Sequence, residues 1–281
     1  MQLKIFAPAA ALALTIGCSS GGPPPVRAGT PEYFFETALD SYSKGDYLKA
    51  NDWMTKLSKS EGEVSGKARA WRMVVLGGLM QGYRELADQY EFGSRANKDK
   101  PGPFFKKTSD YRTLAATMAI ELTENYDAFL KAVPTGDVQL PFPYPPQGSL
   151  AKPTTMDRVG TGQMPSDSEV ATLVSRMLER GVLSMAASAV GASGDAAKAQ
   201  TAYKATPVTA PRATFQLAMA KLLYDASNIF SAKKRNEAGR QEFVLNRVKQ
   251  ALADADKDSK DAKELKARIE ADVKDIAARK K

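Results

Sequence analysis

The sequence predicts an all-α fold, with antiparallel helical hairpins in the N-terminal half and a long helix at the C-terminus. Apolar residues recur every three or four positions through most of the 281 residues, which is the spacing of one helix face. No stretch shows the apolar–polar alternation of a half-buried strand. Hydrophobic residues make up 43% of the chain, which is enough for a core.

Composition divides the chain into a leader, a tether, two helical regions and a proline-rich segment between them. Seven prolines fall within the 32 residues of that segment, where neither a helix nor a central strand is expected. The predicted boundaries are 1–17 for a signal peptide, 18–29 for the tether, 30–133 for the first helical region, 134–165 for the proline-rich segment and 166–281 for the C-terminal helical region.

A short apolar leader ends at the only cysteine. Lys4 precedes about a dozen mostly apolar residues, fewer than the about 20 that span a bilayer. Gly17 and Cys18 follow this run and resemble a lipobox, although Thr15 stands where that motif usually has an apolar residue. The resemblance implies cleavage before Cys18 and acylation of its thiol. The alternative is an ordinary secretory signal with a chance cysteine, which would leave a thiol without a disulfide partner.

The residues after Cys18 predict a spacer and a destination. Residues 19–29 contain three consecutive prolines, which favour an extended path and place the domain about 30 Å from the membrane. Ser19 follows the cysteine. In this it resembles the lipoproteins that bacteria with two membranes send to the outer membrane by default. We therefore expect a lipid-anchored protein of the cell envelope, at the outer membrane and facing the periplasm.

The first helical region opens with a predicted hairpin. Thr30 is a suitable N-cap and Pro31 a suitable first helical residue. Small residues let two helices approach closely, and bulky residues fill the grooves between them. The residues predicted to pack this hairpin are Phe34, Ala38, Gly45, Tyr47, Ala50, Met54 and Leu57.

This pattern resembles a tetratricopeptide repeat (TPR), over about 30 residues. Behind a lipobox, it is similar to the start of the barrel-assembly lipoproteins, whose later repeats are not visible here. The resemblance implies a TPR-like α-solenoid in the N-terminal half and a groove that binds protein partners. A fainter second hairpin is expected to turn at Gly82–Tyr83.

Two further features complete the central part. Thr108 or Ser109 is expected to cap a helix whose apolar stripe runs through Phe129 and stops before Pro134. The proline-rich segment predicts a long ordered loop whose Phe142 and Tyr144 pack on the helices. The alternatives are an exposed polyproline II ligand for an aromatic groove and a plain linker.

The C-terminal region predicts several helices. Ser166 and Glu169 form a capping box before a helix that ends near Gly191. A short alanine-rich helix is expected at 195–205, and a strong apolar stripe follows Pro211 up to Phe230. From Glu237 onward we expect one long helix with a thin apolar seam. It either packs on the body, extends as a free arm or pairs with a partner helix.

Composition also restricts function. The chain has no histidine and a single cysteine, which excludes histidine-dependent nucleophilic and metal sites. It has no Gly-rich phosphate loop, and its carboxylates fall in no recognisable catalytic motif. We therefore expect no enzyme activity, no cofactor and no metal. The net charge is +8, but basic and acidic residues alternate, so a nucleic-acid partner is not expected.

Three functions are consistent with these observations. The first is a membrane-anchored scaffold for an envelope protein that the sequence does not identify. The second is a structural lipoprotein whose C-terminal helix contacts peptidoglycan, because residues 233–281 hold 15 basic and 10 acidic residues. Its end, Arg279–Lys281, loosely resembles lipoproteins that attach to peptidoglycan by a terminal lysine. An alternative to the scaffold is a transporter-associated lipoprotein that presents a small ligand. The third is catalysis through a pair of carboxylates, for example on a glycan, although the sequence places no such pair in a cleft.

Overall fold

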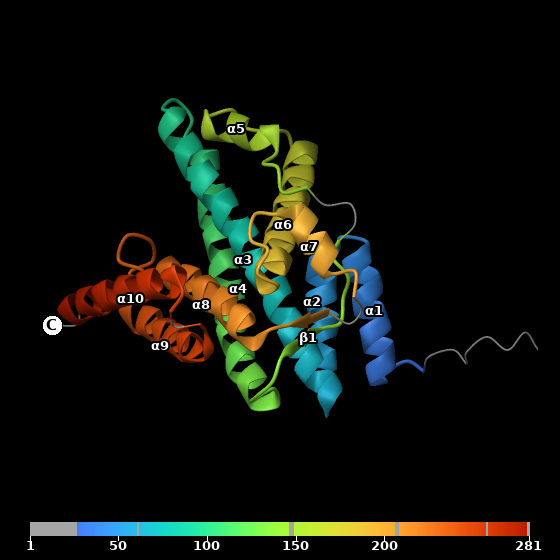
Figure 1. Ribbon diagram of the computed structural model, residues 1–281. Helices are drawn as coiled ribbons and strands as arrows, with labels where there is room; N and C mark the ends of the chain where they lie inside the picture. The colour runs from blue at the N-terminus through green and yellow to red at the C-terminus, as the bar shows by residue number, and fades with distance from the viewer. Residues whose placement is uncertain (1–26, 61, 146–148, 206–207, 257, 280–281) are drawn as a thin grey trace, which may run out of the picture.

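The computed structural model describes residues 27–60, 62–145, 149–205, 208–256 and 258–279. The predictions for the signal peptide, Cys18 and the tether up to residue 26 lie outside this part of the chain. The described residues are mostly helical, so the all-α prediction with helical hairpins is confirmed (Figure 1). None of the described helices has both the length and the apolar composition needed to cross a bilayer.

The elements follow in the order shown in Figure 1. They are α1 (Pro31–Ser43), α2 (Tyr47–Leu57), α3 (Glu63–Ala96), α4 (Gly102–Ala132), β1 (Val138–Leu140), α5 (Thr154–Gly160), α6 (Asp167–Ala189), α7 (Ala196–Ala202), β2 (Val208–Ala210), α8 (Arg212–Ile229), α9 (Ala238–Asp254) and α10 (Lys260–Arg279).

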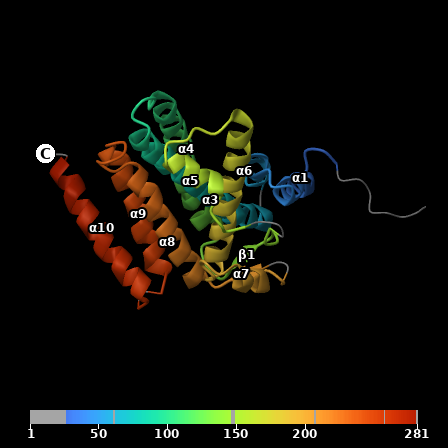
Figure 2. The ribbon, with the colours of Figure 1, turned by 90° about the horizontal axis from the view of Figure 1, so that it is seen from above.

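A long hairpin of α3 and α4 forms the centre of the molecule. The α1–α2 hairpin lies on one side of it, and α8, α9 and α10 lie on the other, in both views of the ribbon (Figures 1 and 2). Helix α6 packs along α3, and α5 lies near the end of the hairpin where α3 meets α4. Every other layer therefore depends on the position of α3.

The predicted turn at Gly82–Tyr83 is wrong, because α3 runs without a break from Glu63 to Ala96. Gly82 and Gly78 instead face the backbone of α6. A Cβ atom at Gly78 would lie within 3.0 Å of the Val182 backbone, and one at Gly181 within 3.0 Å of the Gly78 carbonyl group. These glycines therefore allow α3 and α6 to pack closely, and they do so within a continuous helix rather than at a turn.

The first hairpin forms where it was predicted. Thr30 caps α1, since its hydroxyl oxygen accepts a hydrogen bond from the Tyr33 amide. Gly45 lies between α1 and α2 with a φ of +76°, a conformation that favours glycine. Helix α4, however, begins at Gly102 and not at Thr108 or Ser109. The Thr108 hydroxyl is buried and donates to the Phe104 carbonyl oxygen within the helix, so it caps nothing.

The proline-rich segment is an ordered part of the core. Phe142 and Tyr144 are buried, as predicted. The Phe142 ring lies 5.0 Å from Trp71 of α3 and 5.4 Å from Tyr42 of α1, measured between centroids. The strands β1 and β2 were not expected. They pair antiparallel over three residues, too few for alternation to appear in the sequence.

The C-terminal helices differ from the prediction in one respect. The capping box at Ser166 and Glu169 forms, but the single helix expected from Glu237 is two helices, α9 and α10. Ala255 is extended, and the Ser259 hydroxyl accepts from the Ala262 amide at 3.3 Å and caps α10. Such polar side chains compete with a continuous helix. Helix α10 then folds back on α9 and α8, so it is not a free arm.

The crossing of α3 and α6 generates a stability prediction. Gly181→Ala should lower the free energy of unfolding by about 1–3 kcal/mol or more, because the new methyl group collides with backbone that cannot move alone. Urea denaturation measures the change. Gly239→Ala in α9 is the matched control, since no atom of the described residues lies within 4 Å of its Cβ position. It should be neutral or stabilise by up to about 1 kcal/mol. Equal stability of both variants would contradict the close contact.

Candidate binding site

The residues that the sequence singled out lie in the first hairpin. Five of them are buried, Phe34 is half-buried, and Gly45 forms the turn. The Phe34 ring stacks on Trp53 with 6.0 Å between centroids. The buried five are Ala38, Tyr47, Ala50, Met54 and Leu57. These side chains hold α1 and α2 together, so their role is packing. Cys18 lies outside the described residues.

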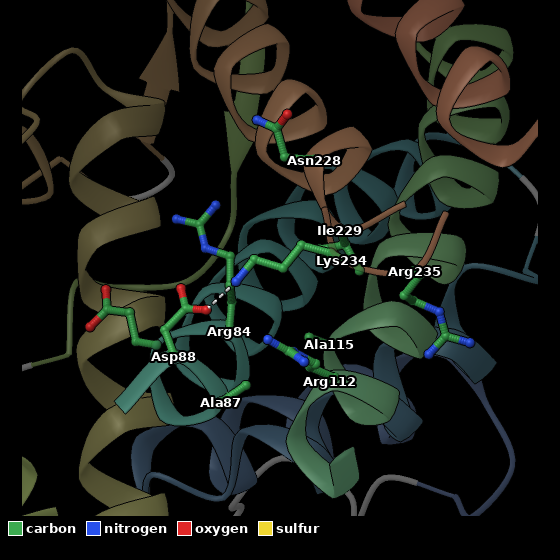
Figure 3. A pocket seen from close by; sticks show the side chains of 10 residues that line it. Arg84, Ala87, Asp88, Arg112, Ala115, Asn228, Ile229, Lys234 and Arg235 are labelled. Atoms are coloured by element: carbon green, nitrogen blue, oxygen red, sulfur yellow. Dashed lines mark hydrogen bonds and ion pairs between the residues drawn. The ribbon is translucent and has the colours of Figure 1, made fainter. Parts of the chain in front are cut away.

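A pocket of about 260 Å³ lies elsewhere, between α3, α4 and the connection from α8 to α9 (Figure 3). Its apolar part is formed by Ala87, Ala115 and Ile229, one from each of the three helices. Charged side chains surround this apolar part. They are Arg84, Glu85, Asp88, Arg112, Lys234 and Arg235.

The charged groups form a network that crosses between elements. The Lys234 ammonium lies 2.7 Å from a carboxylate oxygen of Asp88, a contact drawn in Figure 3, and 3.6 Å from Glu91. The Arg112 guanidinium also donates to Glu91, and Arg84 lies 3.0 Å from Asp225. The network therefore attaches the α8–α9 connection to the α3–α4 hairpin.

Glu91 sits at the centre of this network. Burial opposes its ionisation, but the neighbouring charges of Arg112, Lys234 and Arg95 outweigh that effect, so the pKa of Glu91 lies below its ordinary value. The carboxylate is therefore charged at neutral pH and balances two cations of the pocket wall. Removing it would leave Arg112 without its carboxylate partner.

One donor in the pocket wall is left over. The Nε of Arg112 is buried and has no hydrogen-bond acceptor among the described residues. Such an atom is costly to leave unsatisfied. The Arg112 side chain as a whole is 31% exposed, so its other N–H groups could donate to an oxygen atom of a bound group, while an aliphatic part of that group contacts Ala115 and Ile229. The pocket can thus hold a small carbonyl- or carboxylate-bearing group, such as an acidic side chain.

This pocket could hardly be predicted from the sequence. Arg84, Asp88 and Glu91 follow one another at helical spacing on one face of α3, and this charged stripe is the one signal that was present. Arg112 and Lys234 come from distant parts of the chain, and only the fold brings them to that stripe. No group of three potential metal-ligating side chains occurs in the part of the chain that the structure describes.

No family model matches the chain. No curated protein and no solved structure matches it either. The site must therefore be interpreted from its own geometry.

The ion pairs of Glu91 predict that the free energy of unfolding depends on pH. A carboxylate with a lowered pKa in the folded state stabilises the protein above its ordinary pKa of about 4.5, and this contribution is lost as the pH falls through the folded-state value. Glu91→Gln should therefore lower the free energy of unfolding at pH 7 by about 1–3 kcal/mol, and the difference from wild type should shrink in acid.

Urea denaturation between pH 7 and pH 3 measures this difference. Glu36→Gln on the exposed face of α1 is the control and should follow the wild type at every pH. A difference at Glu91 that stays constant into acid would show that the carboxylate charge does not support the network.

Proposed function

We propose that this chain is a lipid-anchored protein of the cell envelope that acts as a non-enzymatic scaffold for another envelope protein. The observation that carries the proposal is the position of the only cysteine, Cys18, directly after an apolar leader and a small residue, Gly17. Acyl chains on a single cysteine anchor a protein stably when more than one is present. We place the protein at the outer membrane, facing the periplasm.

The arrangement of the body supports this proposal. Residues 27–29, the last residues of the predicted tether, are exposed and lead directly into α1. The pocket lies beside the α8–α9 connection, whereas α1 lies on the other side of the α3–α4 hairpin (Figures 1 and 2). A body tethered at α1 would leave the pocket accessible to a partner. We expect an acidic or carbonyl group of the partner to accept a hydrogen bond from Arg112.

The pocket also supports a second candidate, a transporter-associated lipoprotein that presents a small ligand. A volume of about 260 Å³ is close to the lower limit for small-molecule sites, which is about 300 Å³. Contact with peptidoglycan through the C-terminal helix has less support. Leu265, Ile269 and Ile276 of α10 are buried, and Arg279 donates to Asn236 and Gln241. Only the outer face of that helix remains for an anionic polymer.

Membrane fractionation tests the anchor. Cys18→Ser should move the protein from the membrane fraction to the soluble envelope fraction or leave its leader uncleaved, because the lipid can no longer be attached. Ser20→Ala, two residues away, is the control and should remain with the membrane. If the Cys18→Ser protein stays as membrane-bound as the wild type, the lipid anchor is refuted.

Site-specific crosslinking in the same strain tests the partner. A photo-reactive amino acid at Asn228, in the pocket wall, should yield a discrete crosslinked protein. The same group at Asp52, exposed on α2, is the control and should not yield it. A crosslinked small molecule would support ligand presentation instead. Identical products from both positions would contradict a role for the pocket.

A further inference from the structure

The end of the α3–α4 hairpin presents two aromatic side chains to solvent. Phe105 is 57% exposed and Phe92 is 52% exposed, more than any other large hydrophobic residue of the described chain. Phe92 lies in the last turns of α3 and Phe105 in the first turn of α4. Exposed residues of this size at one end of a protein often mark an interaction surface. We call this end, residues 92–107, the hairpin tip.

The tip is held in place by the core beneath it. Phe104 is buried, and its ring lies 6.1 Å from the ring of Tyr90. A Cβ atom at Gly93 would lie within 3.0 Å of the same ring. The Asn97 amide donates to the Gly162 carbonyl oxygen at 3.0 Å, which attaches the tip to the α5–α6 connection. Successive helical residues point about 100° apart, so burial of Phe104 directs Phe105 outward.

The tip also carries unbalanced positive charge. Residues 92–107 contain five basic residues and one acidic residue. Arg95 is paired with Glu91 and lies over the Phe92 ring. The other four basic residues have no ion-pair partner in the described part of the chain, although most charged groups of the pocket do. These four are Lys98, Lys100, Lys106 and Lys107.

We propose that the hairpin tip docks on the surface of an anionic lipid bilayer. Phe105 and Phe92 would enter the interfacial region, while the lysine ammonium groups would contact lipid phosphates. The observations favour a bilayer over an acidic protein, because the end of a helical hairpin is convex and its aromatic side chains project from it. A deformable planar surface can receive both the rings and the surrounding lysines.

This contact is separate from the proposed lipid at Cys18. Helix α3 has 34 residues and is therefore about 50 Å long. In Figure 1 the hairpin tip lies at the top of the molecule, whereas α1 begins near the bottom. Binding of the tip to a bilayer can consequently be tested without the lipid, and the result does not depend on whether the proposed anchor is correct.

Vesicle sedimentation tests the proposal with the processed chain, residues 18–281, carrying Cys18→Ser, so that neither the lipid nor the apolar leader is present. The protein should sediment with vesicles that mix phosphatidylglycerol and phosphatidylcholine, and it should not sediment with phosphatidylcholine alone. The double variant Lys106→Glu/Lys107→Glu should weaken binding to the mixed vesicles by about tenfold or more, because each lysine near an anionic surface contributes a several-fold gain.

Two controls match these changes elsewhere on the surface. Lys263→Glu/Lys266→Glu makes the same change of charge on exposed positions of α10 and should leave binding within about twofold, which is within the usual variation of exposed charges. Phe105→Ser should reduce binding, whereas Leu48→Ser, at a residue that is 43% exposed on α2, should not. The two lysine double variants and the two serine variants all change side chains at the surface. Circular dichroism should therefore show that all four proteins remain folded.

Fluorescence tests penetration directly. A tryptophan introduced by Phe105→Trp should shift to shorter wavelength when anionic vesicles are added, and one introduced by Leu48→Trp should not. The two native tryptophans, Trp53 and Trp71, provide the common baseline. Absence of binding to anionic vesicles would overturn the proposal. So would equal losses in the tip variants and the α10 control, because this would indicate attraction by overall charge. Binding of the tip to an acidic protein without vesicle binding would also overturn it.

Discussion

The contact between the backbones of α3 and α6 is the constraint on which the rest of the structure depends. Gly78 on α3 and Gly181 on α6 remove the side chains that would separate the two helices. The charged stripe of the pocket begins less than two turns after Gly78, at Arg84, and the hairpin tip lies at the end of the same helix. Because α3 is continuous, its packing at the crossing fixes the direction of both the pocket and the hairpin tip.

Helical periodicity predicted most of the fold, since the apolar stripe of a long amphipathic helix shows which of its faces is buried. It failed at Gly82, because a glycine is equally consistent with a turn and with a close helix contact. The residue that decides between these possibilities, Gly181, lies far away in the sequence. The strands β1 and β2 escaped prediction because each has only three residues. The break between α9 and α10 escaped it because Ala255 and Ser259 interrupt the helix locally, within a pattern that continues on both sides.

The buried aromatic residues, the pocket and the proposed anchor also differ in how far the sequence predicts them. Phe142 and Tyr144 could be predicted as buried residues. A proline-rich segment forms neither a helix nor a central strand, so burial of its aromatic side chains is the main interaction that can order it. The charged pocket could not be predicted, since Glu91, Arg112 and Lys234 meet only after the α8–α9 connection returns to the central hairpin. The proposed anchor at Cys18 depends on local sequence alone. A local motif can be recognised without a fold, whereas a site assembled from distant residues cannot.

These features together describe a central hairpin that carries two separate surfaces, one proposed for a partner and the other proposed for a membrane. Hydrogen exchange of the native protein tests the central claim most directly, because the most stable part of a fold exchanges slowest. Amides of residues 74–83 in α3 and 178–186 in α6 should exchange more slowly than those of α8, α9 and α10. If the slowest amides instead lie in α8 and α9, while those at the crossing exchange readily, the glycine contact is not what organises this protein.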